Sequence, residues 1–85
     1  MAYRVVVAPA AERAFHKLPK ELRKRIIQRV EALAANPRPA NSKKLKGDED
    51  FYRVRVGDWR IVYQIEKQRL VVLVVRIGHR RDVYR

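Results

Sequence analysis

The spacing of apolar residues changes once along the chain and divides it into two parts. In residues 9–35 apolar side chains recur every three or four positions, which is the period of an amphipathic helix. Pro9 suits the first turn of such a helix. Pro19 interrupts the pattern and Asn36-Pro37 ends it, so the spacing predicts two helices. Their buried stripe is predicted to comprise Ala11, Phe15, Leu18, Leu22, Ile26, Val30 and Leu33.

The remaining apolar segments are typical of β-strands. Residues 3–8 form a short apolar run, residues 51–65 largely alternate, and residues 70–78 are apolar almost throughout. A run without alternation is typical of a strand buried on both faces, so residues 70–78 are predicted to form the central strand. The predicted fold class is α+β, a small antiparallel-rich sheet packed against an N-terminal helix pair. The order is β-α-α-β-β-β with a short terminal strand, and residues 1–85 are predicted to form one domain.

Residues 51–65 are predicted to form a β-hairpin that gathers arginines on one face. Gly57-Asp58 is typical of a two-residue type II′ turn, and this turn places Arg55 opposite Arg60. Since alternate residues point to opposite faces, Arg53 lies on the same face as these two residues. The opposite, apolar face comprises Tyr52, Val54, Val56, Trp59, Ile61 and Tyr63. Like charges that face each other destabilise a sheet, so the arginines either extend into water or bind an anion such as phosphate.

The net charge favours a polyanionic partner. Twenty-one Lys and Arg against nine Asp and Glu give +12, a balance typical of proteins that bind nucleic acid. Lys43, Lys44 and Lys46 lie in the connection of residues 36–50, which is predicted to be a loop anchored by Leu45. The longest apolar run is far shorter than the ~20 residues of a membrane span, and the chain has no cysteine. The sequence therefore predicts a soluble, cytoplasmic protein without a membrane partner.

The chain offers little for metal or cofactor chemistry. It has no cysteine, and its two histidines, His16 and His79, fall on different predicted elements. There is no glycine-rich phosphate loop, and Ser42 is the only serine. We therefore expect neither a metal nor a cofactor. RNA cleavage can proceed without them, because the 2′-hydroxyl of RNA can attack the adjacent phosphate while cations stabilise the developing charge.

Two segments in combination resemble RelE-type toxins of the RelE/ParE toxin–antitoxin superfamily. They are YRVRVGDWRIVYQI, at residues 52–65, and GHRRDVY, at residues 78–84. The resemblance also covers the first strand, the helix pair and the KKLKG segment. It implies a RelE-like fold and a metal-independent endoribonuclease that cleaves mRNA in the ribosomal A site and so inhibits translation. It also implies a cognate acidic, RelB-like antitoxin, and we expect an acidic segment of that partner to cover the arginines.

The resemblance also implies roles for individual residues. The expected catalytic residues are Arg53, Arg55, Arg60, Arg80 and Tyr84. Arg60 and Arg80 would hold the scissile phosphate or support the leaving group, and Tyr84 would stack on a base or orient it. The expected RNA-binding residues are Lys43, Lys44, Lys46, His79 and Arg81. Arg76 is interpreted as a buried residue that forms an ion pair or stacks on Trp59, outside the candidate set.

The chain differs from the best-known RelE-type pattern at the hairpin. Arg53 and Arg55 replace lysines, one of which is implicated as a base, and arginine stays protonated. The spacing from Arg80 to Tyr84 is also shorter. Two hypotheses therefore remain for the acceptor of the 2′-hydroxyl proton: His79, or a ribosomal group or water. Two alternatives remain for the function, a ParE-like inhibitor of DNA gyrase and a non-catalytic RNA-binding relative.

Overall fold

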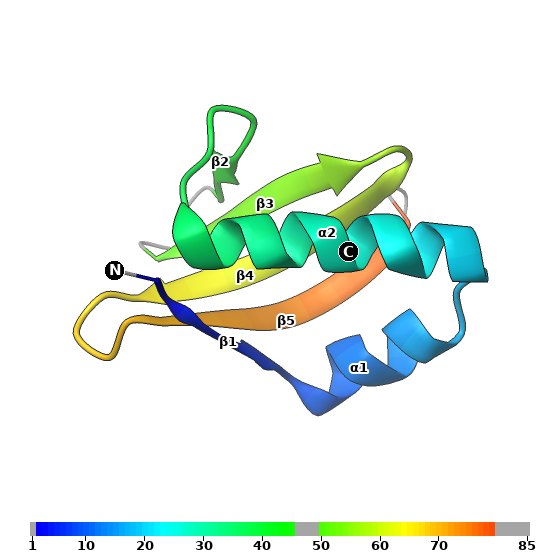
Figure 1. Ribbon diagram of the computed structural model, residues 1–85, viewed down its shortest axis with the longest axis horizontal. Helices are drawn as coiled ribbons and strands as arrows, with labels where there is room; N and C mark the ends of the chain where they lie inside the picture. The colour runs from blue at the N-terminus through cyan, green and yellow to red at the C-terminus, as the bar shows by residue number, and fades with distance from the viewer. Residues whose placement is uncertain (1, 46–49, 80–85) are drawn as a thin grey trace.

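The computed structural model describes residues 2–45 and 50–79, and these form a mixed sheet with two helices on one face (Figure 1). The strands are β1 (Arg4–Val7), β2 (Lys43–Lys44), β3 (Phe51–Val56), β4 (Trp59–Glu66) and β5 (Val71–His79), and the helices are α1 (Pro9–His16) and α2 (Lys20–Ala35). The predicted α+β class is confirmed. The predicted terminal strand lies outside the described residues, as do Lys46, Arg80, Arg81 and Tyr84.

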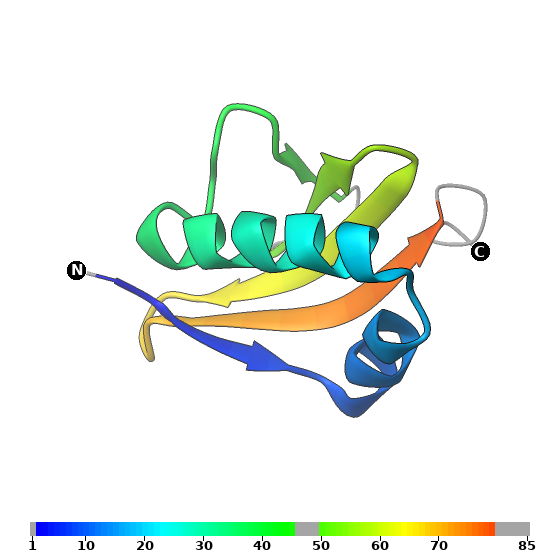
Figure 2. The same ribbon diagram turned by 45° about the vertical axis from the view of Figure 1, so that its right-hand side comes forward.

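Both helices begin and end where the prolines predict. Pro9 occupies the first turn of α1, where its missing N–H would have no partner within the helix. Pro19 immediately precedes α2, which ends before Asn36-Pro37. Figure 2 shows both helices on the same side of the sheet. The buried residues are Ala11 in α1, Ile26 and Leu33 in α2, and Leu18 in the connection between the helices, all in the predicted stripe.

The strand order is β1-β5-β4-β3-β2, with β1 parallel to β5 and the other neighbours antiparallel. The sequence predicts residues 70–78 as the central strand, and this is wrong in detail. β5 is interior, between β1 and β4, but β4 is the middle strand. Both are buried on their two faces: Val71 and Val72 of β5 are 3% and 0% exposed, and Ile61 and Val62 of β4 are 0% and 6% exposed. The apolar run therefore identifies an interior strand without distinguishing it from its neighbour.

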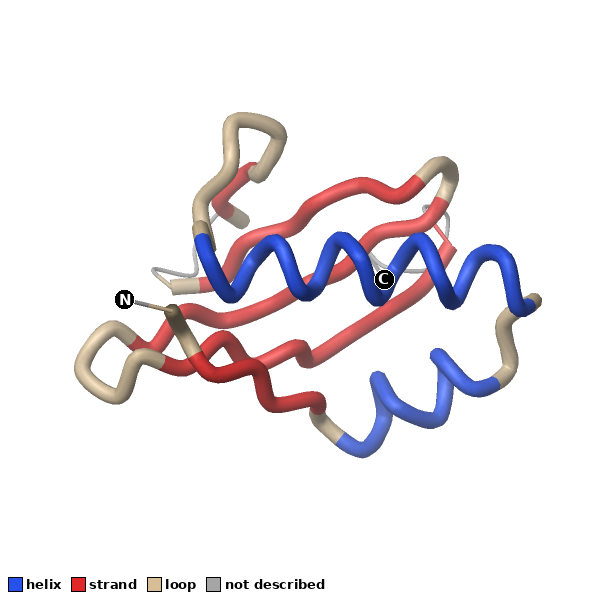
Figure 3. The backbone as a smooth tube through the Cα atoms, in the orientation of Figure 1, coloured by secondary structure: helices blue, strands red, loops and turns tan. Residues whose placement is uncertain are grey.

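The β3–β4 hairpin has the predicted register. Arg55 pairs with Arg60, and Tyr52 pairs with Tyr63. Gly57 has a φ of 61°, and Asp58 does not have a positive φ, as a type II′ turn requires. This turn and the β4–β5 turn lie at opposite ends of the sheet (Figure 3).

The hydrophobic core lies between the helices and one face of the sheet. Its buried sheet residues are Val54, Val56, Ile61, Tyr63, Ile65, Val72, Val74 and Ile77. Trp59 packs against this cluster and is partly exposed. The prediction that the apolar hairpin face is core is therefore confirmed. Among the described residues, no helix has the length and apolar character needed to cross a membrane.

Candidate functional site

The candidate site is the sheet face that the helices leave uncovered. Cross-strand pairing places Lys43, Arg53, Val62 and Arg76 in one row across the strands β2, β3, β4 and β5. The next row contains Arg55, Arg60 and Gly78. Directly paired residues point to the same side of a sheet, so five cations gather there. We call this surface the arginine face: Lys43, Arg53, Arg55, Arg60 and Arg76.

The arginines of this face differ in burial. Arg55 is exposed and Arg53 is partly buried, but Arg60 is only 8% exposed. Arg60 therefore does not extend into water, which is one of the two alternatives for the hairpin arginines. The reason is its place in β4, because the middle strand has neighbours on both sides whereas β3 has only the two-residue β2 on its outer side. A guanidinium withdrawn from water acts on a phosphate through a lower local dielectric than an exposed one.

Arg76 joins the arginine face because of an irregularity in β5. The pairing of β4 with β5 shifts between Val62 and Tyr63, so that Val62 faces Arg76 while Tyr63 faces Val74. Val75 is the extra residue, and such a bulge reverses the alternation beyond it. Arg76 therefore points to the open face and is exposed, and its interpretation as a buried residue is wrong. Sequence reasoning missed it because unbroken alternation from buried Val74 would place Arg76 in the core.

Strand β2 brings one of the predicted lysines to the face. Lys43 pairs with Arg53, whereas Lys44 pairs with Tyr52, whose side chain points to the helix side. Both lysines are exposed. The sequence predicts a loop here, and the structure shows instead a two-residue strand. Two residues are too few to show the alternation of a strand, so the apolar pattern of the sequence cannot reveal β2.

A buried tyrosine ties the connection before β2 to the sheet. The Tyr63 hydroxyl donates a hydrogen bond to the Pro37 carbonyl oxygen at 2.6 Å. The Ser42 hydroxyl donates to the Pro39 carbonyl oxygen at 2.7 Å within the same connection. Burial raises the pKa of Tyr63 to about 12, against a lowering by the Ser42 side chain and a smaller raising by Tyr52. The neutral, hydrogen-bonded phenol thus fixes the segment that leads to Lys43.

His79 lies on the other side of the sheet from Arg60. It pairs with Trp59 at the end of β5, one position beyond the Arg60–Gly78 pair. The imidazole and indole rings meet edge to face, with centroids 5.7 Å apart. Since Trp59 packs against the core cluster, its partner His79 points to the helix side. The sequence groups His79 with the arginines, and the structure places it on the opposite side of the sheet from Arg60.

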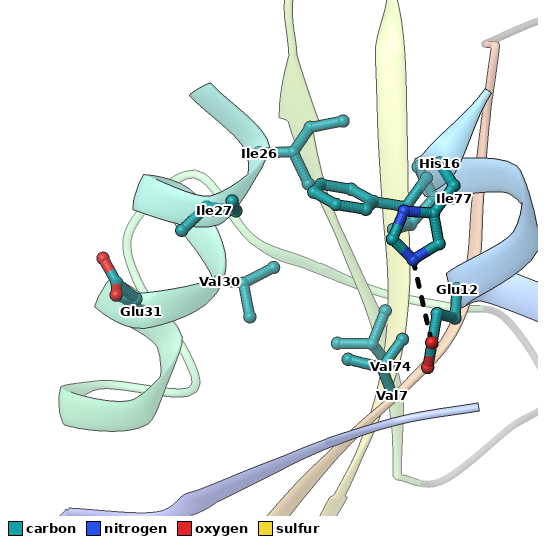
Figure 4. A pocket seen from close by; sticks show the side chains of 10 residues that line it. Val7, Glu12, His16, Ile26, Ile27, Val30, Glu31, Val74 and Ile77 are labelled. Carbon is teal, nitrogen blue, oxygen red and sulfur yellow. Dashed lines mark ion pairs between the residues drawn. The ribbon is translucent and has the colours of Figure 1, made fainter. Parts of the chain in front are cut away.

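An apolar cleft of about 300 Å³ lies between α1 and α2 above β5 (Figure 4). Its apolar lining comprises Val7, Phe15, Ile26, Ile27, Val30, Val74 and Ile77. Its polar residues are Glu12, His16 and Glu31, and His16 Nε2 lies 3.7 Å from Glu12 Oε1. Neither lysine nor arginine lines it. This cleft therefore lacks the charge to hold a phosphate, and the arginine face remains the candidate site.

Comparison with known proteins identifies the family of this chain. Residues 5–84 match the family model of the ParE toxin of the type II toxin-antitoxin system, parDE. A putative RelE-like toxin protein of Escherichia coli is 32% identical over 99% of this chain and 92% of its own length. The mRNA interferase toxin RelE of Escherichia coli K12 is 28% identical, with coverages of 99% and 92%.

Among solved structures, the archaeal RelE–RelB complex from Pyrococcus horikoshii OT3 contains a chain with a TM-score of 0.85 and 28% identity. The match covers 98% of this chain and 100% of that one. The fold and the sequence relatives therefore agree. The chain belongs to the RelE/ParE superfamily of type II toxin–antitoxin systems and is a RelE-type member of it.

Proposed function

We propose that this protein is a toxin that cleaves mRNA on the ribosome and so inhibits translation. The observation that carries the proposal is the buried guanidinium of Arg60 beside the exposed Arg55 on one open sheet face. The relationship to a protein named mRNA interferase toxin RelE supports the same reaction. The substrate would be the mRNA strand in the A site.

In the proposed reaction the 2′-oxygen of one nucleotide attacks the phosphorus that joins it to the next. A bond from the 2′-oxygen to phosphorus forms while the bond from phosphorus to the 5′-oxygen breaks. The products are a 2′,3′-cyclic phosphate and a 5′-hydroxyl end, and the leaving 5′-oxygen takes its proton from water. Negative charge grows on the non-bridging oxygens, and Arg60, held by the middle strand, is oriented toward that charge before the reaction begins. Its planar fork suits two phosphate oxygens at once.

The position of His79 bears on which group takes the 2′-hydroxyl proton. Arg53 and Arg55 stay protonated, and His79 points to the opposite side of the sheet from Arg60. We therefore assign the proton to a ribosomal group or to water. Arg80 would support the leaving oxygen and Tyr84 would stack on a base near the cut, as the resemblance implies. No metal takes part in this scheme.

The other cations of the candidate set would bind RNA rather than act on the reacting atoms. Lys43 lies in the same row as Arg53 and Arg76, so these three side chains would contact the RNA phosphates that flank the cleaved bond. Lys44 is exposed on the other side of β2 and would contact the RNA only at the edge of the sheet. Lys46 and Arg81 keep the RNA-binding role expected from the sequence.

The proposed protein partner is an acidic antitoxin. The relative from Pyrococcus horikoshii OT3 was solved as a RelE–RelB complex, and this chain carries a net charge of +12. An acidic segment of the partner would cover the arginine face and block access to mRNA. Raised salt should slow the association of the two proteins, because screening weakens long-range attraction more than apolar contacts.

The test of function uses ribosomes programmed with a defined mRNA. The protein should produce new mRNA ends in the A-site codon, one carrying a 5′-hydroxyl. A parallel assay of DNA supercoiling by gyrase should show no inhibition. Gyrase inhibition without mRNA cleavage would favour the ParE-like alternative, and RNA binding without either effect would favour the non-catalytic one.

A further inference from the structure

A second cleft, of about 520 Å³, lies at one end of the sheet between α1 and the ends of β4 and β5. Trp59 and His79 contribute aromatic rings to its lining. Its cations are Arg13 of α1, Lys17 at the C-cap of that helix, and Arg76 of β5, which also belongs to the arginine face. Its lining contains neither aspartate nor glutamate. The cleft therefore combines an apolar ring surface with positive charge.

We propose that this cleft binds one nucleotide of single-stranded RNA, with the base against Trp59 and its phosphate between Arg13 and Lys17. The proposal rests on the proposed function, since it adds a second contact for an RNA strand that reaches the arginine face.

The geometry of α1 and β4 supports this assignment. Arg13 and Lys17 are four residues apart, so they lie one turn apart on the same side of the helix, and both are exposed. Trp59 is partly exposed, and His79 meets it edge to face with an interplanar angle of 83°. That arrangement holds the indole ring in place, and an aromatic ring beside cations is the combination that stacks a base and binds its phosphate.

The cleft also lies where an RNA strand could reach it from the arginine face. The Arg60–Gly78 pair and the Trp59–His79 pair are consecutive along β4 and β5. A strand that leaves Arg60 would cross the end of the sheet, past the glycine, and enter the cleft on the helix side. The cleft between α1 and α2 provides a contrast, because its polar residues include Glu12 and Glu31 and would repel a phosphate.

The test uses the intrinsic fluorescence of Trp59, the only tryptophan in the chain. The probe is a short single-stranded 2′-O-methyl RNA, which has no free 2′-hydroxyl and resists cleavage. Binding should quench the fluorescence to saturation. The double variant Arg13→Ala/Lys17→Ala should bind about tenfold more weakly and reduce the salt dependence of binding by about two counterions. Alanine is the best helix former, so α1 should persist.

The matched control is Lys67→Ala/Arg69→Ala, which removes the same charge at the β4–β5 turn, the opposite end of the sheet. Equal weakening by the two double variants would overturn the proposal, because it would show a general charge effect. Absence of quenching by an RNA that binds would overturn it as well.

A ribosome experiment identifies the source of the nucleotide. An abasic residue beside the cut should weaken binding of the wild type to programmed ribosomes if the cleft takes an mRNA base. If the abasic residue has no effect while Arg13→Ala/Lys17→Ala still weakens binding, the nucleotide comes from ribosomal RNA. Quenching by the probe without any mRNA cleavage would refute the proposed function and leave the cleft assignment intact. Cleavage of mRNA without quenching by the probe would refute the cleft assignment and leave the proposed function intact.

Discussion

The two faces of the β3–β4 hairpin are made by the same short segment but differ in their surroundings. One face packs in the core beneath the helices, and the other carries the candidate site. Ile61 and Tyr63 are both 0% exposed beneath the helices, in a row of apolar side chains. Arg60 lies between the partly buried Trp59 and the buried Ile61 in sequence but points to the open side, with Arg53 and Arg55. Strand alternation thus places a core position and a proposed catalytic position one residue apart. A substitution should reveal its face by whether it changes the free energy of unfolding or the rate of cleavage.

The largest effect should come from Arg60. Replacement by alanine removes a donor to the developing charge and should lower single-turnover mRNA cleavage by about 10²–10³. Arg60→Lys should remain impaired, because an ammonium does not reproduce the bidentate fork. Cleavage is compared at equal concentrations of folded protein, and thermal melting is the control for the packing that the buried Arg60 side chain contributes. Unchanged cleavage by the alanine variant would mean that Arg60 does not act on the phosphate.

Ile61→Ala should show the reverse behaviour. It removes a fully buried side chain beneath α2 and should lower the free energy of unfolding by about 2–5 kcal/mol. Ile61→Val, with a loss of about 0.5–1.5 kcal/mol, provides a variant that stays folded. Chemical denaturation measures both. A fall in the cleavage rate per folded molecule would contradict the claim that substitutions on the core face change stability alone.

Tyr63 should make stability depend on pH in the alkaline range. Its pKa is raised to about 12 in the folded protein, so the neutral phenol is favoured by folding. Its contribution should be complete below the ordinary tyrosine value of 10.0 and should decline as pH rises toward 12, by on the order of 2 kcal/mol. Denaturation of wild type and Tyr63→Phe should therefore converge as pH rises through this window. Parallel curves for the two proteins would show that Tyr63 is not the group responsible.

The smallest effect should come from Leu70, which precedes β5. Leu70 has a φ of 53°, a left-handed conformation that strains residues with a Cβ atom. Leu70→Gly relieves that strain and should raise the free energy of unfolding by up to about 1 kcal/mol, with no change in cleavage. Leu70→Val, which cannot relax in this conformation, should destabilise the protein. A stabilising valine would show that the strain is absent.

The sequence predicts the hairpin side of this comparison well. Gly57-Asp58 determines the turn, and alternation then determines the pairing of Arg55 with Arg60 and the two faces. The helices follow from Pro9 and Pro19 together with the helical period of their apolar residues. The turn residues, the prolines and the helical period act on neighbouring residues in the sequence, so their effects can be predicted without knowing the fold.

The parts that sequence reasoning missed depend on neighbouring strands. The bulge that turns Arg76 outward exists only in the pairing of β4 with β5. The burial of Arg60 follows from the place of β4 in the middle of the sheet, and β2 forms only because β3 is there to pair with it. The separation of His79 from Arg60 likewise follows from its register with Trp59.

The most direct test of the account compares Arg60→Ala with Ile61→Val, adjacent positions on opposite faces, in single-turnover cleavage on programmed ribosomes at equal concentrations of folded protein. We expect a rate about 10²–10³-fold below wild type for Arg60→Ala and a wild-type rate for Ile61→Val. Equal rates for the two variants would contradict the claim that the open face of the hairpin carries the chemistry.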